Sequence, residues 1–251
     1  MGEKLSVLIP TFNEAENIAD CIRSIGDLAD ELLVMDSFST DRTVEIARSL
    51  HADVQQRAFD NYSKNKNAAL DKLSHNWVLV LDADERLSEP LRQEIREVLA
   101  GPTCDAYRID RETFFKSRRV RCWSSGSVLR LFRRDKAHFR EDRLVHEELI
   151  IQGSVGHLKS PLLHYTFRSF SQYLPKMHSF AELAARQAHQ EGRRASRTGL
   201  LLHPPVRFLK TYLLRGGIWD GIPGLLIAWL SAYSIYLKYA RLWELQKDAE
   251  R

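Results

Sequence analysis

The stretch that most constrains the fold of this chain is the run from Trp77 to Leu81, five apolar residues that lead directly into Asp82 and Asp84. An uninterrupted apolar run of this length is typical of a strand that is buried on both faces, as in a parallel sheet. Ligands of open α/β sheets bind beyond the carboxyl ends of the strands, which is where these two carboxylates fall. The run therefore predicts a fold class and the sheet edge at which a site would form.

Two carboxylates separated by one small residue have two interpretations. Like charges at the end of a buried strand raise each other's pKa and destabilise the fold unless a cation neutralises them. Mg²⁺ or Mn²⁺ would fit, because such hard cations take one or two carboxylates and share their remaining positions with substrate phosphates. The alternative is an ordinary strand end at which an Asp caps the helix that begins near Ser88, in a stretch that also carries Glu85.

Short apolar strands and helical patterns alternate along the first hundred residues. Strand-like runs occupy 5–9, 31–35 and 77–81, with a weaker one at 53–56, and helical spacing fills 13–25, 43–50 and 61–73. This alternation predicts a parallel sheet with right-handed crossovers and helices on both faces. Asn13 followed by Glu16 has the spacing of a capping box, which predicts the start of the first helix.

Polar residues follow the ends of successive predicted strands; they are Thr11, Asn13, Glu14, Asp36, Asp82 and Asp84. Each could serve only as a helix cap, but their convergence at one edge of the sheet favours a binding site. The sequence contains neither Gly-x-Gly-x-x-Gly nor a Walker-type lysine loop. Dinucleotide-binding and P-loop functions therefore have no residues to support them.

Length and composition indicate one large globular domain, or one domain with an appendage. The chain has 251 residues, of which 44% are apolar and 28% charged. Three widely spaced cysteines form neither a disulfide framework nor a zinc motif, which favours a reducing compartment. The N-terminus lacks the apolar core of a signal peptide, so we expect a cytoplasmic location.

Positive charge is concentrated in two segments, although the net charge is only +4. Residues 111–143 hold eleven Lys and Arg against four acids, and residues 192–219 hold six against none. Such patches indicate anionic partners: phosphates, nucleic acid or an acidic membrane surface. Nucleic acid is disfavoured, because it would leave the ordered carboxylates unexplained and no strand interleaves arginine with base-stacking aromatics.

Four motifs, in order and at suitable spacing over roughly residues 4–100, resemble those of family 2 glycosyltransferases; they are Val7-Leu-Ile-Pro-Thr-Phe-Asn-Glu14, Asp36-Ser-Phe-Ser-Thr-Asp-Arg-Thr43, Lys66-Asn67 and Leu81-Asp-Ala-Asp84. The resemblance implies the GT-A fold and a nucleotide-sugar donor, with a UDP-hexose expected. It also implies a donor-binding set; this is Pro10, Thr11, Asn13, Glu14, Asp36, Lys66, Asn67, Asp82 and Ala83. Asp82 would lie by the ribose and the metal, and Asp84 would coordinate Mg²⁺ or Mn²⁺ between the two phosphates.

The catalytic base is sought near residue 145. An attacking sugar hydroxyl must lose its proton, so inverting transfer needs a carboxylate or histidine near the anomeric carbon. The candidates are Asp142, His146, Glu147 and Glu148. Resemblance to one branch of the family, through Arg130-Leu-Phe-Arg133 and Val145-His-Glu147, favours Glu147. GT-A enzymes often take a further metal ligand from a later histidine, which points to His164 ahead of His157.

The C-terminal third has a different character, and we divide the chain into a catalytic domain of residues 1–168 and a helical region of residues 169–251. One helix is expected over 171–194, and Pro204-Pro205 is expected to open another. Residues 221–237 carry no charge but are short for a membrane span. Beside the basic segment 192–215, the aromatic-rich stretch 218–239 fits an interfacial, membrane-associating region. The alternative is packing in a homo-oligomer interface or against the catalytic domain.

These features predict an inverting, metal-dependent glycosyltransferase that works at the inner face of the cytoplasmic membrane. The whole layout resembles the lipopolysaccharide-core β-glucosyltransferase branch, which implies a lipopolysaccharide-core or other lipid-linked saccharide as the acceptor and an anionic membrane surface as a partner. The alternative is an enzyme of the same fold with a peptide or protein acceptor. A peptide-acceptor enzyme would not need the basic and apolar tail.

Overall fold

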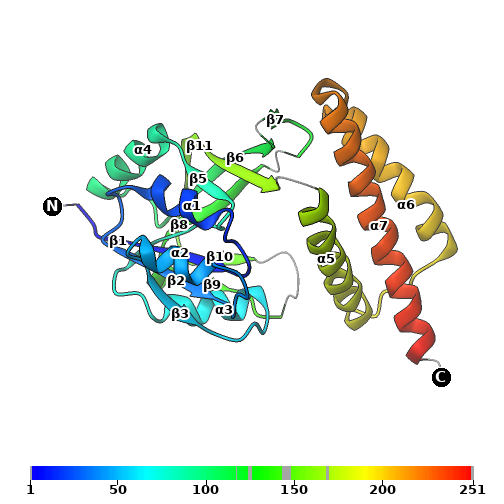
Figure 1. Cartoon of the computed structure of the whole chain (residues 1–251), viewed down its shortest axis with the longest axis horizontal. Coiled ribbons are helices and arrows are strands. Elements are labelled where there is room, and N and C mark those ends of the chain that lie inside the picture. Colours follow the sequence, from blue (N-terminus) through cyan, green and yellow to red (C-terminus); the bar gives the residue numbers. More distant parts are fainter. Residues whose placement is uncertain (1, 117, 124–125, 143–147, 168–169, 250–251) are drawn as a thin grey trace. The chain divides into compact units, whose positions relative to one another are not determined.

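In the computed structural model (Figure 1), which describes residues 2–116, 118–123, 126–142, 148–167 and 170–249, the chain forms two compact units. The first unit consists of three segments, Met1–Glu112, Ser125–Asp142 and Glu147–Thr166. The second consists of Thr113–Ser124, Arg143–His146 and Phe167–Arg251. The second unit thus combines the C-terminal region with an internal segment that lies more than forty residues earlier in the chain.

Nine strands of the described residues form one mixed sheet; they are β1 Leu5–Thr11, β2 Glu31–Asp36, β3 Asp53–Gln56, β4 Trp77–Val80, β5 Glu85–Leu87, β6 Ala106–Phe115, β7 Arg118–Val120, β8 Ser127–Arg133 and β11 Val155–Phe167. Their order is β3-β2-β1-β4-β8-β6-β11-β5, with β7 paired to β6 beside this path. A separate ribbon pairs β9 (Ala137–Phe139) with β10 (Leu149–Ile151). The short helix η1 spans Arg134–Lys136.

The sheet is parallel in the half that the alternating pattern of the first hundred residues covers, and antiparallel in the other half. Strands β3, β2, β1 and β4 run parallel, as the alternating pattern predicted. Strand β8 then runs antiparallel to β4 and to β6, and β5 runs antiparallel to β11. Strands β6, β7 and β8 follow one another through short loops, which suit antiparallel neighbours such as β6 and β7, whereas parallel neighbours need a crossover.

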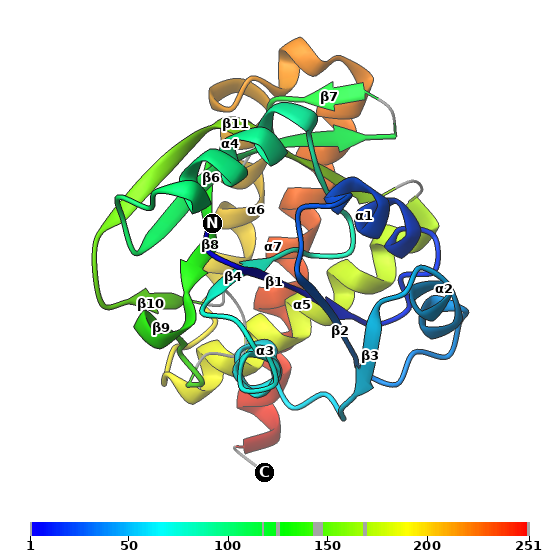
Figure 2. The same ribbon diagram turned by 90° about the vertical axis from the view of Figure 1, so that its left-hand side faces the viewer.

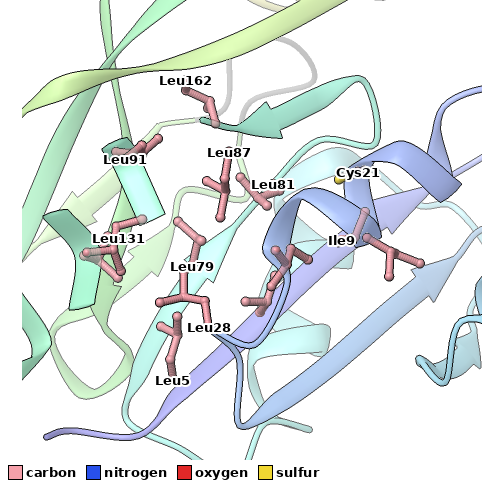
Figure 3. Close-up of a cluster of buried hydrophobic side chains, with 14 of the residues drawn as sticks. Leu5, Ile9, Cys21, Leu28, Leu79, Leu81, Leu87, Leu91, Leu131 and Leu162 are labelled. Atoms are coloured by element: carbon pink, nitrogen blue, oxygen red, sulfur yellow. The ribbon is translucent and has the colours of Figure 1, made fainter. Parts of the chain in front are cut away.

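Helices cover both faces of the sheet in the first unit; they are α1 Ile18–Ile25, α2 Thr43–Ser49, α3 Tyr62–Leu70 and α4 Glu89–Ala100. Alternate residues of β4 enter two different apolar clusters. Leu79 packs in the cluster that α1 and α4 cover (Figure 3), and Val78 packs in the cluster that α3 covers. The strand is therefore buried on both faces, as its apolar composition predicted.

Two helix starts show which capping signals act. Helix α4 begins near Ser88 as expected, but its cap is Ser88 itself, whose hydroxyl accepts a hydrogen bond from the Leu91 N–H at 3.3 Å. The predicted capping box at Asn13 is wrong: α1 begins at Ile18, and Asn13 has a φ of +56°. The Asn13 side-chain oxygen instead accepts from the Thr40 N–H at 2.8 Å, in a left-handed conformation that asparagine tolerates well.

The second unit contains the C-terminal helices; they are α5 Phe170–Gln190, α6 Arg197–Leu209, the π-helical turn η2 Lys210–Leu214, the 3₁₀ turn η3 Gly217–Asp220 and α7 Ile222–Ala249. Helix α7 packs on both α5 and α6 (Figure 1). Arg241 Nε lies 2.7 Å from Glu182 of α5, and the rings of Tyr239 and His203 of α6 are 4.9 Å apart. Within the described ranges, no helix has the length and hydrophobicity that crossing a bilayer requires.

The prolines of α6 lie inside the helix, which corrects the expectation that they open it. Helix α6 begins seven residues before Pro204, after Ser196, whose hydroxyl accepts from the Gly199 N–H at 2.9 Å. This cap satisfies one of the amide groups that a helix start leaves without a partner. The sequence signal of a serine cap therefore decided where the helix starts, and the two prolines did not.

Candidate active site at the carboxyl edge of the sheet

The ends of β1, β2 and β4 lie at the same edge of the sheet. Thr11 at the end of β1 is in register with Asp36 at the end of β2. On the other side of β1, the Leu81 N–H donates to the Leu8 carbonyl at 3.0 Å, which carries the end of β4 alongside. The segment from Asp82 to Asp84 then joins β4 to β5. Parallel pairing of these strands is what brings the polar residues of three motifs to one edge.

An ion cluster surrounds Asp82; we define it as Asp82, Glu85, Arg130 and Lys66, of which all but Asp82 are buried. Arg130, on β8, donates from Nη2 to carboxylate oxygens of both acids, and its bond to Glu85 Oε1 is 2.6 Å long. Lys66 Nζ lies 3.6 Å from Asp82 Oδ1. The Asp82 N–H also donates to Glu85 Oε2 at 3.0 Å. Each acid of the cluster thus has a cationic partner, and Arg130 bridges the two.

The pKa values of the two acids in the cluster are shifted in opposite directions. Burial alone would raise the pKa of Asp82, but Arg130 and Lys66 outweigh burial, so its pKa lies well below the usual range. Burial raises the pKa of Glu85, and although Arg130 opposes this, the Asp82 charge adds to the rise. Asp82 is therefore held ionised at the more open side of the cluster, and the fully buried Glu85 accepts a hydrogen bond from its backbone N–H.

Asp84 and His164 form a second pair at the same edge. His164 Nε2 lies 3.5 Å from Asp84 Oδ2, and both side chains are largely but not fully buried. Pairing of β5 with β11 positions them, because the Tyr165 N–H donates to the Asp84 carbonyl at 2.8 Å. Burial lowers the pKa of His164, but the Asp84 carboxylate outweighs burial and the pKa is raised. The structure thus brings together the two residues that the sequence predicted as metal ligands.

The donor atoms at this edge fit a hard divalent cation. Carboxylate oxygens suit Mg²⁺ and Mn²⁺, and such cations commonly keep waters and substrate phosphates in their remaining positions. In the part of the chain that the structure describes, no group of three or more His, Cys, Asp or Glu side chains could hold a metal ion. Asp84 with His164 would therefore supply two protein ligands, which is enough for a cation whose other ligands belong to a diphosphate.

A second set of bonds organises the predicted nucleoside side of the site. The Asp36 carboxylate is fully buried and accepts from Thr11 Oγ1 at 3.1 Å, the Ser39 N–H at 2.9 Å and Gln56 Nε2 at 3.0 Å. The loop that follows β2 braces the loop that follows β1: Thr43 Oγ1 accepts from the Glu14 N–H at 2.8 Å. Much of the motif that begins at Asp36 therefore fixes the shape of the neighbouring loop.

Lys66 and Asn67 are adjacent in α3 but have different neighbours. Lys66 is buried and points to Asp82, with Nζ 5.6 Å from the centre of the Phe139 ring. Asn67 binds the backbone of β9 instead: its side-chain nitrogen donates to the Phe139 carbonyl at 2.8 Å, and its oxygen accepts from the Phe139 N–H at 3.0 Å. Successive helix residues point about 100° apart, which explains the divergence. The predicted donor contact of Asn67 stays a prediction.

The remaining predicted site residues have the following positions. Pro10 is half-buried in β1, and Ala83 is buried between the two aspartates. Glu147 and His146 lie outside the described residues. The other candidates for the base, Asp142 and Glu148, are exposed, and both pair with Arg140, at 2.7 and 3.1 Å.

Three residues of the site were missed by the sequence reasoning. Arg130 and Glu85 complete the ion cluster, and Arg86 fixes the loop between β4 and β5 by donating to the Ala83 carbonyl at 2.8 Å. The available signal was the charged pair Glu85-Arg86 directly after Asp84, inside what proves to be a buried strand. A buried charge requires a partner, and for Glu85 that partner is 45 residues away on β8.

A half-parallel α/β sheet with aspartates at its carboxyl edge is typical of enzymes that bind a nucleotide at strand ends. Residues 6–153 match the family model of "Glycosyl transferase family 2", and the chain belongs to this family. It is a glycosyltransferase. Both the family and the α/β fold with helices that the sequence predicted are confirmed, with the sheet mixed as described above.

Relatives match over nearly the whole chain. The lipopolysaccharide core biosynthesis glycosyltransferase LpsC of Rhizobium meliloti is 30% identical and covers 94% of this chain and 93% of its own length. An uncharacterized glycosyltransferase of Rickettsia typhi is 28% identical, with 97% and 88% covered. Among solved structures, S. aureus TarS 1-349 in complex with UDP has a TM-score of 0.51 at 17% identity, covering 98% of this chain and 92% of that one. Glucosyl-3-phosphoglycerate synthase from Mycobacterium tuberculosis, with phosphoglyceric acid, scores 0.50 at 18% identity, with 78% and 82% covered.

Proposed function

We propose that this glycosyltransferase transfers a hexose from a UDP-sugar to a lipopolysaccharide-core or other lipid-linked saccharide, with inversion at the anomeric carbon. The observation that carries the proposal is the similarity to LpsC over 94% of this chain, which includes the C-terminal helices as well as the catalytic sheet. A family 2 domain alone would support only the general reaction. Similarity that extends through the helical region supports a shared type of acceptor.

The donor would bind across the strand ends. In our proposal Thr11, Glu14 and Asp36 contact the nucleoside, with Pro10 and Asn13 shaping the loop beside them. Asp82 would accept hydrogen bonds from the ribose, because Arg130 and Lys66 keep its carboxylate ionised and hold it in place. Ala83 leaves room beside the two aspartates, and Asn67 supports this side through β9. The ion cluster thus fixes the donor site before the donor arrives.

Asp84 and His164 would hold Mg²⁺ or Mn²⁺ next to the diphosphate. Bound there, the cation would stabilise the negative charge that develops on the departing nucleoside diphosphate. The chain's own contribution is positional. The backbone bond from Tyr165 to Asp84 and the pairing of β5 with β11 keep the carboxylate and the imidazole facing the same point.

The transfer would be a single displacement. The acceptor hydroxyl oxygen forms a bond to the anomeric carbon while the bond from that carbon to the diphosphate oxygen breaks. The hydroxyl proton passes to a carboxylate, for which we propose Glu147 on the basis of the family resemblance. The alternatives remain Glu148 and Asp142. We also propose that the reaction takes place at the inner face of the cytoplasmic membrane, where a lipid-borne acceptor and an anionic surface would be available.

The test is a transfer assay with purified protein, a panel of nucleotide sugars and lipopolysaccharide truncated in its inner core. We expect a UDP-hexose to be used, chelation to stop the reaction, added Mn²⁺ or Mg²⁺ to restore it, and NMR of the product to show an inverted linkage. Transfer to a peptide but to no lipid-linked saccharide would overturn the acceptor assignment, and a retained linkage would overturn the mechanism.

The base is tested separately, with Glu147→Gln. This change keeps the shape but removes the ability to accept a proton, so donor affinity should persist while turnover falls by about a hundred-fold or more. Glu148→Gln and Asp142→Asn are matched controls that should retain turnover. An active Glu147→Gln variant beside an inactive control would move the base to the other residue and leave the reaction class unchanged.

A further inference from the structure

The end of the helical hairpin formed by α6 and α7 exposes an unusual density of large apolar side chains. We call this set the apolar tip; it consists of Leu213, Leu214, Ile218, Trp219, Ile222 and Leu225. Leu214 is 81% exposed, Trp219 76% and Ile222 74%. All six fall within thirteen residues, in η2, η3 and the first turn of α7. Contiguous exposed apolar surface of this kind marks an interaction site.

The tip has a defined shape because glycines allow η3 to pack tightly on α7. Gly216 has a φ of +78°, a conformation that favours glycine. A Cβ added at Gly224 would lie 1.9 Å from the Gly217 carbonyl oxygen, so any side chain there would push η3 away. Trp219 and its neighbours therefore project from a fixed turn.

A basic hairpin lies next to the apolar tip, although it comes about a hundred residues earlier in the chain. We call the pair formed by β7 and the end of β6, together with the adjoining Lys116, Arg121 and Cys122, the basic hairpin; its exposed cations are Lys116, Arg118, Arg119 and Arg121. Asp220 in η3 joins the two: its Oδ2 accepts from the Arg121 N–H at 2.8 Å and from the Cys122 N–H at 2.9 Å. Figure 2 shows β7 beside the orange segment that joins α6 to α7.

Apolar packing reinforces this junction. Phe115, Val120 and Cys122 of the basic hairpin form a cluster with Ile227 of α7, one turn beyond the tip. The cluster and the Asp220 carboxylate together fix the hairpin cations around the tip. All contacts named here lie within the second unit.

The charges around the tip are of one sign. Between residues 203 and 237, which include the tip, the sequence has three basic residues, Arg207, Lys210 and Arg215, and a single acid, Asp220. Asp220 is buried, and its carboxylate accepts hydrogen bonds from two backbone N–H groups, so the charged groups that face the solvent here are cations. Burial and the nearby Arg215 guanidinium both lower the pKa of Arg207, which shows positive groups crowded together. An exposed Trp- and Leu-rich tip surrounded by cations complements a bilayer with anionic headgroups, because the apolar groups can enter the acyl boundary while the cations stay at the phosphates.

We infer that the apolar tip and the basic hairpin form one docking surface for an anionic phospholipid bilayer, into which the tip inserts to a shallow depth. The inference deepens the proposed function and rests on it in one respect: a lipid-borne acceptor is the reason why the enzyme would bind a bilayer. A protein partner would match only if it presented acids opposite the hairpin cations, whereas an anionic bilayer carries negative headgroups over its whole surface. A second copy of this chain would face the same cations without acids to meet them.

The test is co-sedimentation of the full chain with vesicles of phosphatidylglycerol and phosphatidylcholine in equal parts, compared with pure phosphatidylcholine. The unchanged protein should bind the anionic vesicles, and salt should weaken binding without abolishing it. Leu214→Ser with Trp219→Ser should weaken partitioning about ten-fold or more at any salt concentration. Arg118→Glu with Arg119→Glu should remove the preference for anionic vesicles.

Matched controls come from the same unit. Leu201→Ser with Trp243→Ser removes the same two residue types from exposed sites outside the tip, and Arg193→Glu with Arg194→Glu makes the same charge change outside the hairpin. Both controls should bind nearly as well as the unchanged protein. Equal losses in controls and test variants would overturn the proposed surface, because binding would then depend on overall composition.

Two further measurements guard against variants that misfold or surfaces that self-associate. Lipids brominated near the headgroup should quench the fluorescence of the unchanged protein, and Trp219→Phe should remove most of that quenching. The inference would be overturned if the protein stayed in the supernatant and formed a dimer. If Leu214→Ser with Trp219→Ser then dissociated that dimer, the apolar tip would bind a second copy of the chain and not a bilayer. Vesicle binding without any transfer to lipopolysaccharide would instead refute the proposed function alone.

Discussion

The two units place charge and hydrophobicity in opposite ways. The sheet unit buries the charged side chains of Glu85, Arg130 and Lys66 among apolar side chains. The helical unit contributes most of the large apolar side chains that are exposed, Trp219 and Leu214 among them, while its Asp220 is buried. Each arrangement lowers stability when the unit is considered alone. This contrast is what the proposed donor site in one unit and the proposed docking surface in the other would require.

The largest expected effect is the loss of activity when Asp84 is removed from the sheet unit. Asp84→Ala should reduce transfer by at least about a hundred-fold, because it takes away the anionic ligand proposed for the cation. The fold should remain, as judged by circular dichroism. Asp110, which pairs with His157 at 3.1 Å on the exposed surface, offers a matched control in Asp110→Ala. Wild-type turnover of Asp84→Ala at limiting Mn²⁺ would refute the metal assignment.

Removing the Arg130 guanidinium from the ion cluster should produce the largest change in stability. Arg130→Met leaves Glu85 fully buried without its closest partner, so the free energy of unfolding should fall by about 3–5 kcal/mol in a denaturant titration. Arg133→Met on the same strand removes a half-exposed guanidinium and should cost far less. Combining Arg130→Met with Glu85→Leu should recover much of the loss. No recovery would mean that the interior of the sheet unit depends on Arg130 for another reason.

The buried acid of the helical unit should have a smaller effect. Asp220→Ala leaves the N–H groups of Arg121 and Cys122 without an acceptor, which costs about 1–3 kcal/mol for each buried donor. Asp220→Asn keeps an acceptor oxygen and should lose less. Because the same carboxylate holds the basic hairpin, vesicle binding should fall together with stability. Unchanged binding by a destabilised Asp220→Ala protein would separate the hairpin from the docking surface.

The smallest effect is expected from an exposed ion pair between two helices. Slight burial would raise the pKa of Glu182, but bonds from Arg241 and Arg186 outweigh it and the pKa is lowered. A lowered carboxyl pKa stabilises the fold above the unfolded-state pKa, and this contribution disappears as the pH falls through the folded-state value. Glu182→Gln should therefore cost at most about 1 kcal/mol at neutral pH and nothing in acid. A loss as large as that of Arg130→Met would contradict the contrast between the units.

The sequence predicted the parts of the fold that depend on local pattern. The apolar run at Trp77 predicted the central strand, and the alternation of elements predicted the parallel half of the sheet. The helix start near Ser88 was also predicted. The antiparallel half was missed, because pairing of β8 with β4 joins residues that are far apart in sequence. Asn13 and Pro204 were misread for a similar reason, since a distant loop and a stronger cap decided their roles.

The position of the candidate site could be predicted from the sequence, but the residues that hold its side chains in place could not. Strand-end motifs placed Asp82, Asp84 and Asp36 at one edge because that edge follows from the strand pattern. Nothing local links Asp82 to Arg130, which lies 48 residues away on a neighbouring strand. Asn67 belongs to a motif, yet its contacts to β9 depend on how α3 packs. Residues that act on a ligand leave local signals, whereas residues that act on other residues become visible only in three dimensions.

Strand β6 contributes residues to both units, which limits where the chain can be cut or joined to a relative in a chimera. Its first residues pair with β8 in the sheet unit, and its last residues, Thr113 to Phe115, pair with β7 in the helical unit. A protein cut at residue 168 would keep the basic hairpin but lose Ile227 and Asp220, which cover and hold it. The C-terminal helices are therefore not an exchangeable module. A chimera between relatives would function only if residues 113–124 were inherited together with the tail.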